Sequence, residues 1–253
     1  MTSKRIILSI VIALVAQHFV KAQTNVQFFY DFGADRQYYT ATIEGFYTDD
    51  WGDTFFFIDQ DLNTVNDNSS TYSIGGSYME ISRNINFWRN MAIAPLSLHL
   101  EYNGGVSIGQ SFQNAFLAGL DYGISMRGGK SNINLQVLFK YIAYRDERAF
   151  SKAPLQFTGT WTLRDIFGLK GLTFSGFADF WWEDHKLLID HFGEMLPEQS
   201  SIVFMAEPQL WYNVGGLFGC NQLHVGTEVE LSYDAVVHKG FWCRPCAGVK
   251  WVF

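Results

Sequence analysis

Acidic and aromatic side chains share alternate positions in several short stretches of the sequence. They are Glu44, Phe46, Asp53, Phe55, Phe57 and Asp59, with Phe29, Asp179 and Trp181 at equivalent positions elsewhere. An aromatic ring can stack on a flat ring of a solute, and a carboxylate can accept hydrogen bonds from its hydroxyl groups. We interpret these nine residues as a binding track for a small neutral solute that carries a ring and hydroxyl groups.

The elements that position these residues show a period of two. Residues 96–102 place Leu96, Leu98, Leu100 and Tyr102 on one side and Ser97, His99 and Glu101 on the other. Such alternation is typical of a β-strand with one apolar and one polar face. Twelve segments of this kind are expected, at 26–32, 36–48, 53–61, 71–82, 95–105, 112–127, 132–145, 154–164, 172–183, 201–213, 221–233 and 242–253.

The number and length of these segments predict an all-β fold, a twelve-stranded antiparallel transmembrane β-barrel. Bacterial single-chain barrels have an even number of strands, and most of these segments are long enough to cross a bilayer at a tilt. The charged fraction of 17% equals the aromatic fraction and lies below the roughly 25% of a soluble domain. Outer-membrane lipid is therefore the expected partner of the apolar rows, and the polar rows are expected to line a narrow interior.

The first 22 residues have the pattern of a cleaved export signal. Lys4 and Arg5 precede the apolar stretch from Ile6 to Ala16, and Val20-Lys21-Ala22 fits a cleavage site. We therefore divide the chain into a signal peptide (1–22) and an outer-membrane barrel (23–253), exported to the outer membrane of a Gram-negative cell. The precursor has a net charge of −7, and loss of three cations leaves the mature chain near −10, so nucleic acid is not an expected partner.

The carboxyl end alternates from Ala247 and stops at an aromatic residue, Phe253. A final amphipathic strand of this form resembles the signal read by the barrel-assembly machinery, which is thus a second expected partner. Trp51, Trp161, Tyr212 and Trp251 are expected in aromatic girdles at the membrane interfaces. The barrel is expected to be a monomer.

Four stretches resemble strands of the Tsx-type nucleoside-specific channel-forming outer-membrane proteins. They are residues 39–59, Met79-Glu80-Ile81, residues 172–183 and Val249–Phe253. The resemblance is firmest over residues 36–61, and the shorter chain with reduced loops is similar to a compact, Bacteroidota-like branch of those channels. It implies a twelve-stranded channel with a narrow pore that takes nucleosides.

The polar parity of the strands gives the full set of residues expected in the interior. Beyond the track, they include Gln27, Asp31, Thr40, Thr42, His99, Glu101, Asp121, Lys140, Arg164, Glu183, Glu207, Gln209, Trp211, His224, Glu228, Glu230, Arg244 and Lys250. Glu80 is ambiguous. Parity from Tyr72 to Tyr78 places it on the lipid side, whereas the resemblance places it inside, which a bulge near Gly75-Gly76 allows.

Other functions remain open. A filled barrel could serve as a structural anchor or adhesin, and Asp184-His185 and Asp190-His191 in an external loop could activate water in a hydrolase. No hydrolase or phosphate-binding motif is present, so we expect no enzyme, catalytic residue, cofactor or metal site. Cys243-Arg-Pro-Cys246 is read as an optional bridge or free thiols, and Cys220 has no assigned role.

Overall fold

The computed structural model describes residues 21–62, 74–107, 110–111, 114–143, 154–185, 188–197, 199–236 and 238–253. The proposed signal peptide up to residue 20 lies outside them. Within the described residues, no helix has the length and apolar character needed to cross a membrane.

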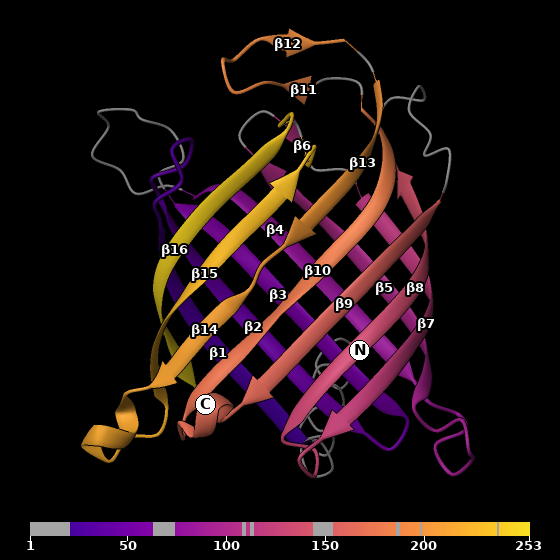
Figure 1. Cartoon of the computed structure of the whole chain (residues 1–253), viewed down its shortest axis with the longest axis vertical. Coiled ribbons are helices and arrows are strands. Elements are labelled where there is room, and N and C mark those ends of the chain that lie inside the picture. The colour runs from indigo at the N-terminus through magenta and orange to yellow at the C-terminus, as the bar shows by residue number, and fades with distance from the viewer. Residues whose placement is uncertain are drawn as a thin grey trace, which may run out of the picture.

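The described chain forms a closed, twelve-stranded antiparallel barrel, as the sequence predicts (Figure 1). Neighbours in sequence are neighbours in the sheet, β1 pairs with β16, and β9 pairs with β10 to close the ring. The barrel strands are β1 (Lys21–Asp31), β2 (Tyr39–Asp49), β3 (Gly52–Leu62), β4 (Ile74–Ile85), β5 (Leu96–Ser107), β7 (Asn114–Met126), β8 (Ser131–Ala143), β9 (Leu155–Arg164), β10 (Leu172–His185), β13 (Gln199–Ala206), β14 (Gln209–Asn213), β15 (Leu223–Tyr233) and β16 (Phe241–Val252).

β13 and β14 together make one barrel strand. Both pair with β10 in a single register, and both pair with β15 in a single register. The interruption falls at Pro208, which has no N–H to donate to the sheet. Its carbonyl still accepts a hydrogen bond from Val229 N at 3.1 Å, so the sheet continues past it.

Three short elements lie outside this ring. β6 (Gln110–Ser111) pairs with the end of β5. β11 (Leu188–Ile189) and β12 (Met195–Leu196) form a hairpin at the edge away from Lys21 and Phe253, the ends of the described chain, which we call the termini (Figure 1). Two 3-10 turns, η1 (Ile166–Gly168) and η2 (Gly215–Phe218), lie in connections at the edge that carries the termini.

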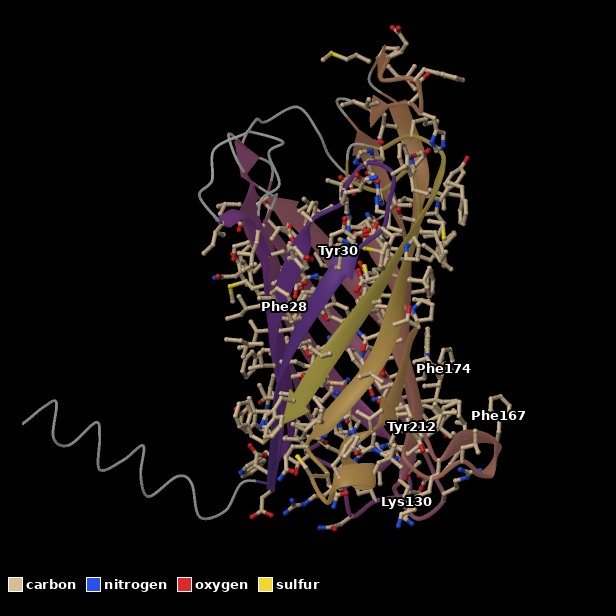
Figure 2. All side chains as sticks on the ribbon, turned by 90° about the vertical axis from the view of Figure 1, so that its left-hand side faces the viewer. Phe28, Tyr30, Lys130, Phe167, Phe174 and Tyr212 are labelled. Carbon is tan, nitrogen blue, oxygen red and sulfur yellow. The ribbon has the colours of Figure 1, made fainter. Side chains whose placement is uncertain are left out.

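The alternation in the sequence sorts side chains between the two faces of the wall. Apolar residues on the outer face are 39–54% exposed in a continuous band; examples are Val26, Phe28, Ile43, Leu100, Phe116, Leu135, Phe139, Ile202, Leu210 and Val249. Figure 2 shows Phe28, Tyr30, Phe174 and Tyr212 directed outward from the ribbon. The opposite parity is polar and largely buried.

Two corrections to the predicted strands have local causes. The strand expected from residue 36 begins at Tyr39, because Gln37 has a left-handed φ of 55° that a strand cannot contain. The ambiguity at Glu80 is resolved by a register shift between Asp61 and Leu62, opposite Gly75. This is the bulge that the sequence allowed, and it turns Glu80 into the interior.

The connection at 86–95 packs against the wall. Trp88 Nε1 donates to the Leu96 carbonyl at 2.5 Å, and Asn86 Nδ2 donates to the Ala94 carbonyl at 2.6 Å. The ring of Phe87 contacts Trp51 edge-on at 6.3 Å. The segment is therefore a hydrogen-bonded turn that carries aromatic residues along the barrel edge.

Candidate functional site: the acidic interior of the barrel

The interior face carries a row of polar side chains that runs from one edge of the barrel to the other. Its members hydrogen-bond across strands, as in Thr42 to Asp59 (2.5 Å) and Thr158 to Asp179 (2.6 Å). Many are almost fully buried, among them Asn25, Gln27, His99, Asp121, Gln156, Glu230 and Arg244. The interior is therefore narrow, and most of its lining groups hydrogen-bond to one another.

Two arginines hold the carboxylates at the mouth of the barrel away from the termini. Arg244 binds both oxygens of Asp35 at 2.8–3.1 Å and Glu230 at 2.5 Å. Arg36, from the β1–β2 connection, binds the other oxygen of Glu230 at 2.5 Å and Asp31 at 3.3 Å. We call these five residues the mouth cluster.

The mouth cluster fixes the charge of Asp35. Burial opposes ionisation of its carboxyl, but the hydrogen bonds and the charge of Arg244 outweigh burial and keep the pKa of Asp35 below its ordinary value. Asp35 is therefore a carboxylate at neutral pH, and the β1–β2 connection is held against β15 and β16 by charge-assisted hydrogen bonds.

Further in, Lys140 lies over the ring of Trp181, with its Nζ 3.6 Å from the ring centroid. The ammonium donates to Gln156 Oε1 at 2.7 Å, and Trp181 Nε1 donates to Glu183 at 2.8 Å. This cation–π contact stabilises a buried ammonium within an acidic stretch of wall.

A second lysine repeats the arrangement nearer the edge that carries the termini. Lys250 Nζ lies 4.0 Å from the centroid of the Trp211 ring, and Trp211 Nε1 donates to Gln209. Gln209 in turn donates to Glu228 at 2.5 Å. Two tryptophan faces are thus covered by the chain's own ammonium groups at two heights.

A third network surrounds His99 in the half of the interior near the termini. Its ring nitrogens lie 2.7 Å from Asn84 Oδ1 and 2.9 Å from Glu101 Oε2. On the neighbouring strands Gln136 donates to Asp121 at 2.7 Å, and Asn84 donates to Asp53 at 3.2 Å. These bonds give His99 a structural role in the lining.

Aromatic rings form a ladder on the interior face of β3 and β4. The centroids of Phe55 and Phe57 lie 6.2 Å apart, and those of Phe57 and Tyr78 lie 6.0 Å apart. Both phenylalanines are half-buried, and Phe46 is paired in register with Phe55 and is 41% exposed. The ladder of Phe55, Phe57 and Tyr78 is flanked on the same strands by Asp53, Asp59 and Glu80.

In the structure, some residues of the predicted binding track are accessible from the interior, and others are covered by neighbouring side chains. Phe46, Phe55 and Phe57 keep exposed ring surface, whereas Phe29 is 4% exposed beneath Trp211 and Trp181 is 8% exposed beneath Lys140. Each predicted carboxylate accepts an internal hydrogen bond: Glu44 from Asn25, Asp53 from Asn84, Asp59 from Thr42 and Asp179 from Thr158. The residues that remain together and open are those of β2 and β3.

Sequence reasoning missed several interior residues. Arg36 was expected at the start of the strand at 36–48 without an assigned role, and it lies in the β1–β2 connection. Tyr78 was placed outside because the bulge was not fixed, and Asn84 lay beyond the end of the strand expected at 71–82. Gln156 and Thr158 shared the polar parity without an evident role.

The residues considered for hydrolysis have other partners. Asp190 Oδ1 accepts hydrogen bonds from the backbone of Phe192 and Glu194, and the ring of His191 stacks on Trp242 at 4.2 Å. The side chain of His185 lies outside the described residues. In the described part of the chain no three His, Cys, Asp or Glu side chains are grouped to hold a metal ion, and all three cysteines are free thiols.

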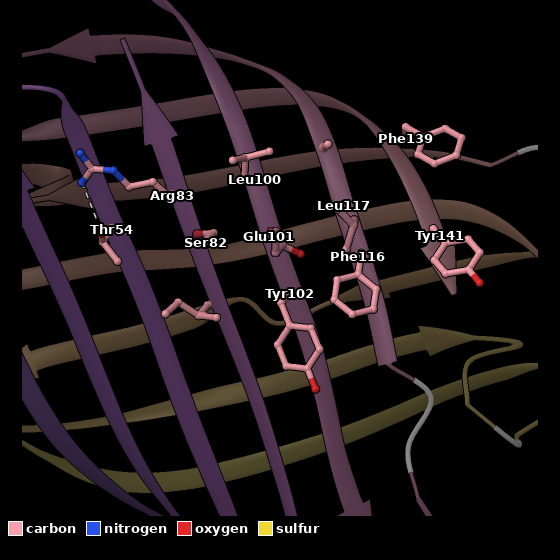
Figure 3. Close-up of a pocket in the computed structure, with 12 residues that line it drawn as sticks. Thr54, Ser82, Arg83, Leu100, Glu101, Tyr102, Phe116, Leu117, Phe139 and Tyr141 are labelled. Atoms are coloured by element: carbon pink, nitrogen blue, oxygen red, sulfur yellow. Dashed lines mark hydrogen bonds between the residues drawn. The ribbon is translucent and has the colours of Figure 1, made fainter. Parts of the chain in front are cut away.

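An open groove marks the outer wall rather than the interior. It runs across β3, β4, β5, β7 and β8 and is lined mostly by outward residues such as Leu100, Phe116, Phe139 and Tyr141 (Figure 3). Arg83 stands at one end, bound to Thr54 at 3.0 Å and Asp49 at 2.8 Å. This surface belongs to the apolar band and takes no part in the interior site.

The family described as Domain of unknown function (DUF5020) matches residues 22–253. The chain belongs to this family. No curated protein is significantly similar to it in sequence. The match covers the whole barrel, and it neither names nor excludes the Tsx-type channels that the sequence resembles.

Solved structures of outer-membrane channels are similar to this chain at low sequence identity. The NanC porin superposes with a TM-score of 0.53 and 10% identity over 90% of this chain and 98% of that chain. A KdgM porin in complex with disordered oligogalacturonate gives 0.47 and 9% over 91% and 99%, and the COG4313 outer membrane channel from Pseudomonas putida F1 gives 0.44 and 11% over 92% and 95%. The NanC likeness shows a shared barrel fold.

Proposed function

We propose that this protein is an outer-membrane channel that passes small solutes through its narrow acidic interior. The observation that carries the proposal is the continuous polar row inside a closed ring whose outer face is an apolar band. A closed barrel leaves no unpaired strand edge in lipid, and its outward side chains match a hydrocarbon environment. The predicted export signal and the terminal Phe253 support the same location.

Charge defines the first level of selectivity. Interior carboxylates outnumber interior cations, even after the mouth cluster is counted as neutralised. The carboxylates are Asp31, Glu44, Asp53, Asp59, Asp61, Glu80, Glu101, Asp121, Asp179, Glu183, Glu207, Glu228 and Glu230, and the cations are Arg36, Lys140, Arg164, Arg244 and Lys250. A net negative lining favours cations and neutral solutes and repels phosphorylated ones.

Nucleosides are the substrate class that we propose for this channel. The aromatic ladder and Phe46 offer ring faces for a base, and Asp53 and Asp59 lie on the same strand as acceptors for ribose hydroxyls. Of the nine residues in the binding track proposed from the sequence, we now assign solute contact to Phe46, Asp53, Phe55, Phe57 and Asp59. We assign a structural role in the lining of the channel to the other four, which are Phe29, Glu44, Asp179 and Trp181.

Ion current through single channels in planar bilayers tests this function. We expect adenosine or thymidine to block the current more strongly than a sugar of similar size. Phe55→Ala should weaken that block by about 1–3 kcal/mol, the usual contribution of one stacked base. Asp53→Asn should cost less, about 0.5–1.5 kcal/mol, because an amide still accepts a hydrogen bond.

Phe28→Ala provides the matched control, because Phe28 is the same residue type on the outer face of β1. It should leave nucleoside block unchanged. Equal block by nucleosides and sugars, unaffected by Phe55→Ala, would reduce the assignment to a narrow general pore.

A filled barrel is the second candidate, and one observation favours it. Leu117, Leu138 and Val203 point inward and are at most 3% exposed, and Trp211 is 1% exposed. Bilayers that contain folded protein but show no conductance would favour this structural function over transport.

A further inference from the structure

Large apolar side chains stand exposed on the connections at the edge that carries the termini. In the β9–β10 connection, Phe167 is 90% exposed and Leu169 is 56% exposed. In the β14–β15 connection, Phe218 is 79% exposed and Leu217 is 70% exposed. Side chains of this size seldom remain in water without a partner surface.

These two connections are neighbours and are firmly built. Asp165 Oδ1 accepts a hydrogen bond from Gly171 N at 2.8 Å, and Asn213 N donates to the Gly171 carbonyl at 3.1 Å. Arg127 also donates to the carbonyls of Arg164 and Asp165 at 2.9 and 3.2 Å. The exposed rings are therefore held in place by the turn backbone.

Phe167 stands in a conformation that its own chain does not explain. Its φ of 54° is left-handed, which is unfavourable for a bulky residue, yet nine-tenths of its surface contacts nothing within the described chain. Figure 2 shows the turn with Phe167 extending sideways from the wall, close to the level of Tyr212. The ring is directed toward the region that surrounds the barrel.

Exposed apolar residues also occur on the opposite side of the ring. β4 and β5 lie opposite β14 and β15 in the strand order, and their connection exposes Phe87 (61%), Met91 (65%) and Ile93 (52%). A single protein partner bound beside β14 could not cover both sides of the barrel. A lipid surface that encircles the barrel covers them all.

The exposed rings continue an apolar face that already meets lipid in the proposed location. Trp251 (43% exposed) and Tyr212 (39% exposed) lie on the outer wall just above them, and Lys170 follows Leu169 in the sequence. Aromatic rings beside a lysine suit the boundary between acyl chains and phosphate headgroups. The connection at 127–130, Arg-Gly-Gly-Lys, has no apolar tip and provides an internal contrast.

We propose that the β9–β10 and β14–β15 connections insert Phe167, Leu169, Leu217 and Phe218 into the headgroup boundary of the inner leaflet and set the depth of the barrel in the membrane. The occupant is phospholipid. The inference rests on the membrane location in the proposed function and is independent of the solute that the channel passes.

Site-directed fluorescence in phospholipid vesicles tests the inference. The three native cysteines are replaced by serine, and an environment-sensitive dye is attached at Phe167→Cys, Phe218→Cys or, as the control, Lys130→Cys. We expect blue-shifted emission and quenching by lipids brominated near the headgroup end of the acyl chain at 167 and 218. The label at 130 should instead be quenched by aqueous iodide.

Heat-modifiable migration and single-channel conductance are recorded first for each variant. Failure to insert would count against the proposed membrane location itself. Inserted barrels whose labels at 167 and 218 are quenched by iodide as strongly as the label at 130 would overturn the anchor and leave the channel intact. Phe167→Ser with Phe218→Ser provides a second measurement, in which we expect bromolipid quenching of the native tryptophans near this edge to fall while conductance is unchanged.

Discussion

Replacement of Arg244 by glutamine should destabilise the barrel by disrupting the mouth cluster. The guanidinium is 2% exposed and binds Asp35 through two nitrogens and Glu230 through a third. Removal of one partner of a buried ion pair costs about 3–5 kcal/mol. Because Glu230 keeps Arg36 at 2.5 Å and the Asp35 side chain is 22% exposed, we expect the lower end, about 3 kcal/mol.

Equilibrium urea unfolding in phospholipid vesicles, followed by tryptophan fluorescence, measures this loss. With an m-value of about 2 kcal/mol/M the midpoint should fall by roughly 1.5 M. Arg164→Gln is the matched control, since Arg164 is exposed and its side chain donates a hydrogen bond to Gln23 at 3.3 Å; its cost should stay below about 0.5 kcal/mol. Arg36→Gln combined with Arg244→Gln should cost more than the two single changes together, because Glu230 then has no cation. Equal midpoints for Arg244→Gln and Arg164→Gln would refute a stabilising mouth cluster.

Two further predictions concern acid and assembly. The pKa values of Asp35 and Asp234 are both lowered, because Arg244 and Lys239 outweigh the effect of burial. The two carboxylates therefore stabilise the folded barrel fully above the ordinary pKa of about 3.9, and this contribution is lost as the pH falls through the lowered values. The urea midpoint should thus fall below about pH 4, and Asp35→Asn should reduce that fall. Deletion of Phe253, whose side chain is 75% exposed, should lower the amount of assembled barrel in the outer membrane without shifting the unfolding midpoint of barrels that have assembled; an unchanged amount would remove its role as a recognition element.

The fold was predictable because one simple rule governs every strand. In a barrel made of a single β-sheet, an apolar outer face and a polar inner face require apolar and polar residues to alternate along every strand. The rule fails where the backbone leaves regular strand geometry. Gly75 shifts the parity of Glu80, and the left-handed Gln37 moves Arg36 out of the strand and into the mouth cluster.

Parity predicts the face of a residue but not its accessibility. Phe29 and Phe55 both point inward, yet Phe29 is covered by Trp211 and packs where Gly248 has no side chain, whereas Phe55 remains half-open beside Phe57. The difference depends on which residues the neighbouring strands place opposite each ring. A single strand's sequence does not contain that information.

The contacts of Trp181 with Lys140 and of Trp211 with Lys250 also depend on strand register, and they affect the charge of the interior. Lys140 reaches Trp181 across β9, because Gln156 pairs with Leu138 on one side and with Trp181 on the other. A shift of two residues in either pairing would keep every face assignment and still separate the ammonium from the ring. Register therefore decides that the acidic interior is interrupted by ammonium groups at two heights. In the proposed channel, a solute would meet zones of alternating charge rather than a uniformly negative pore.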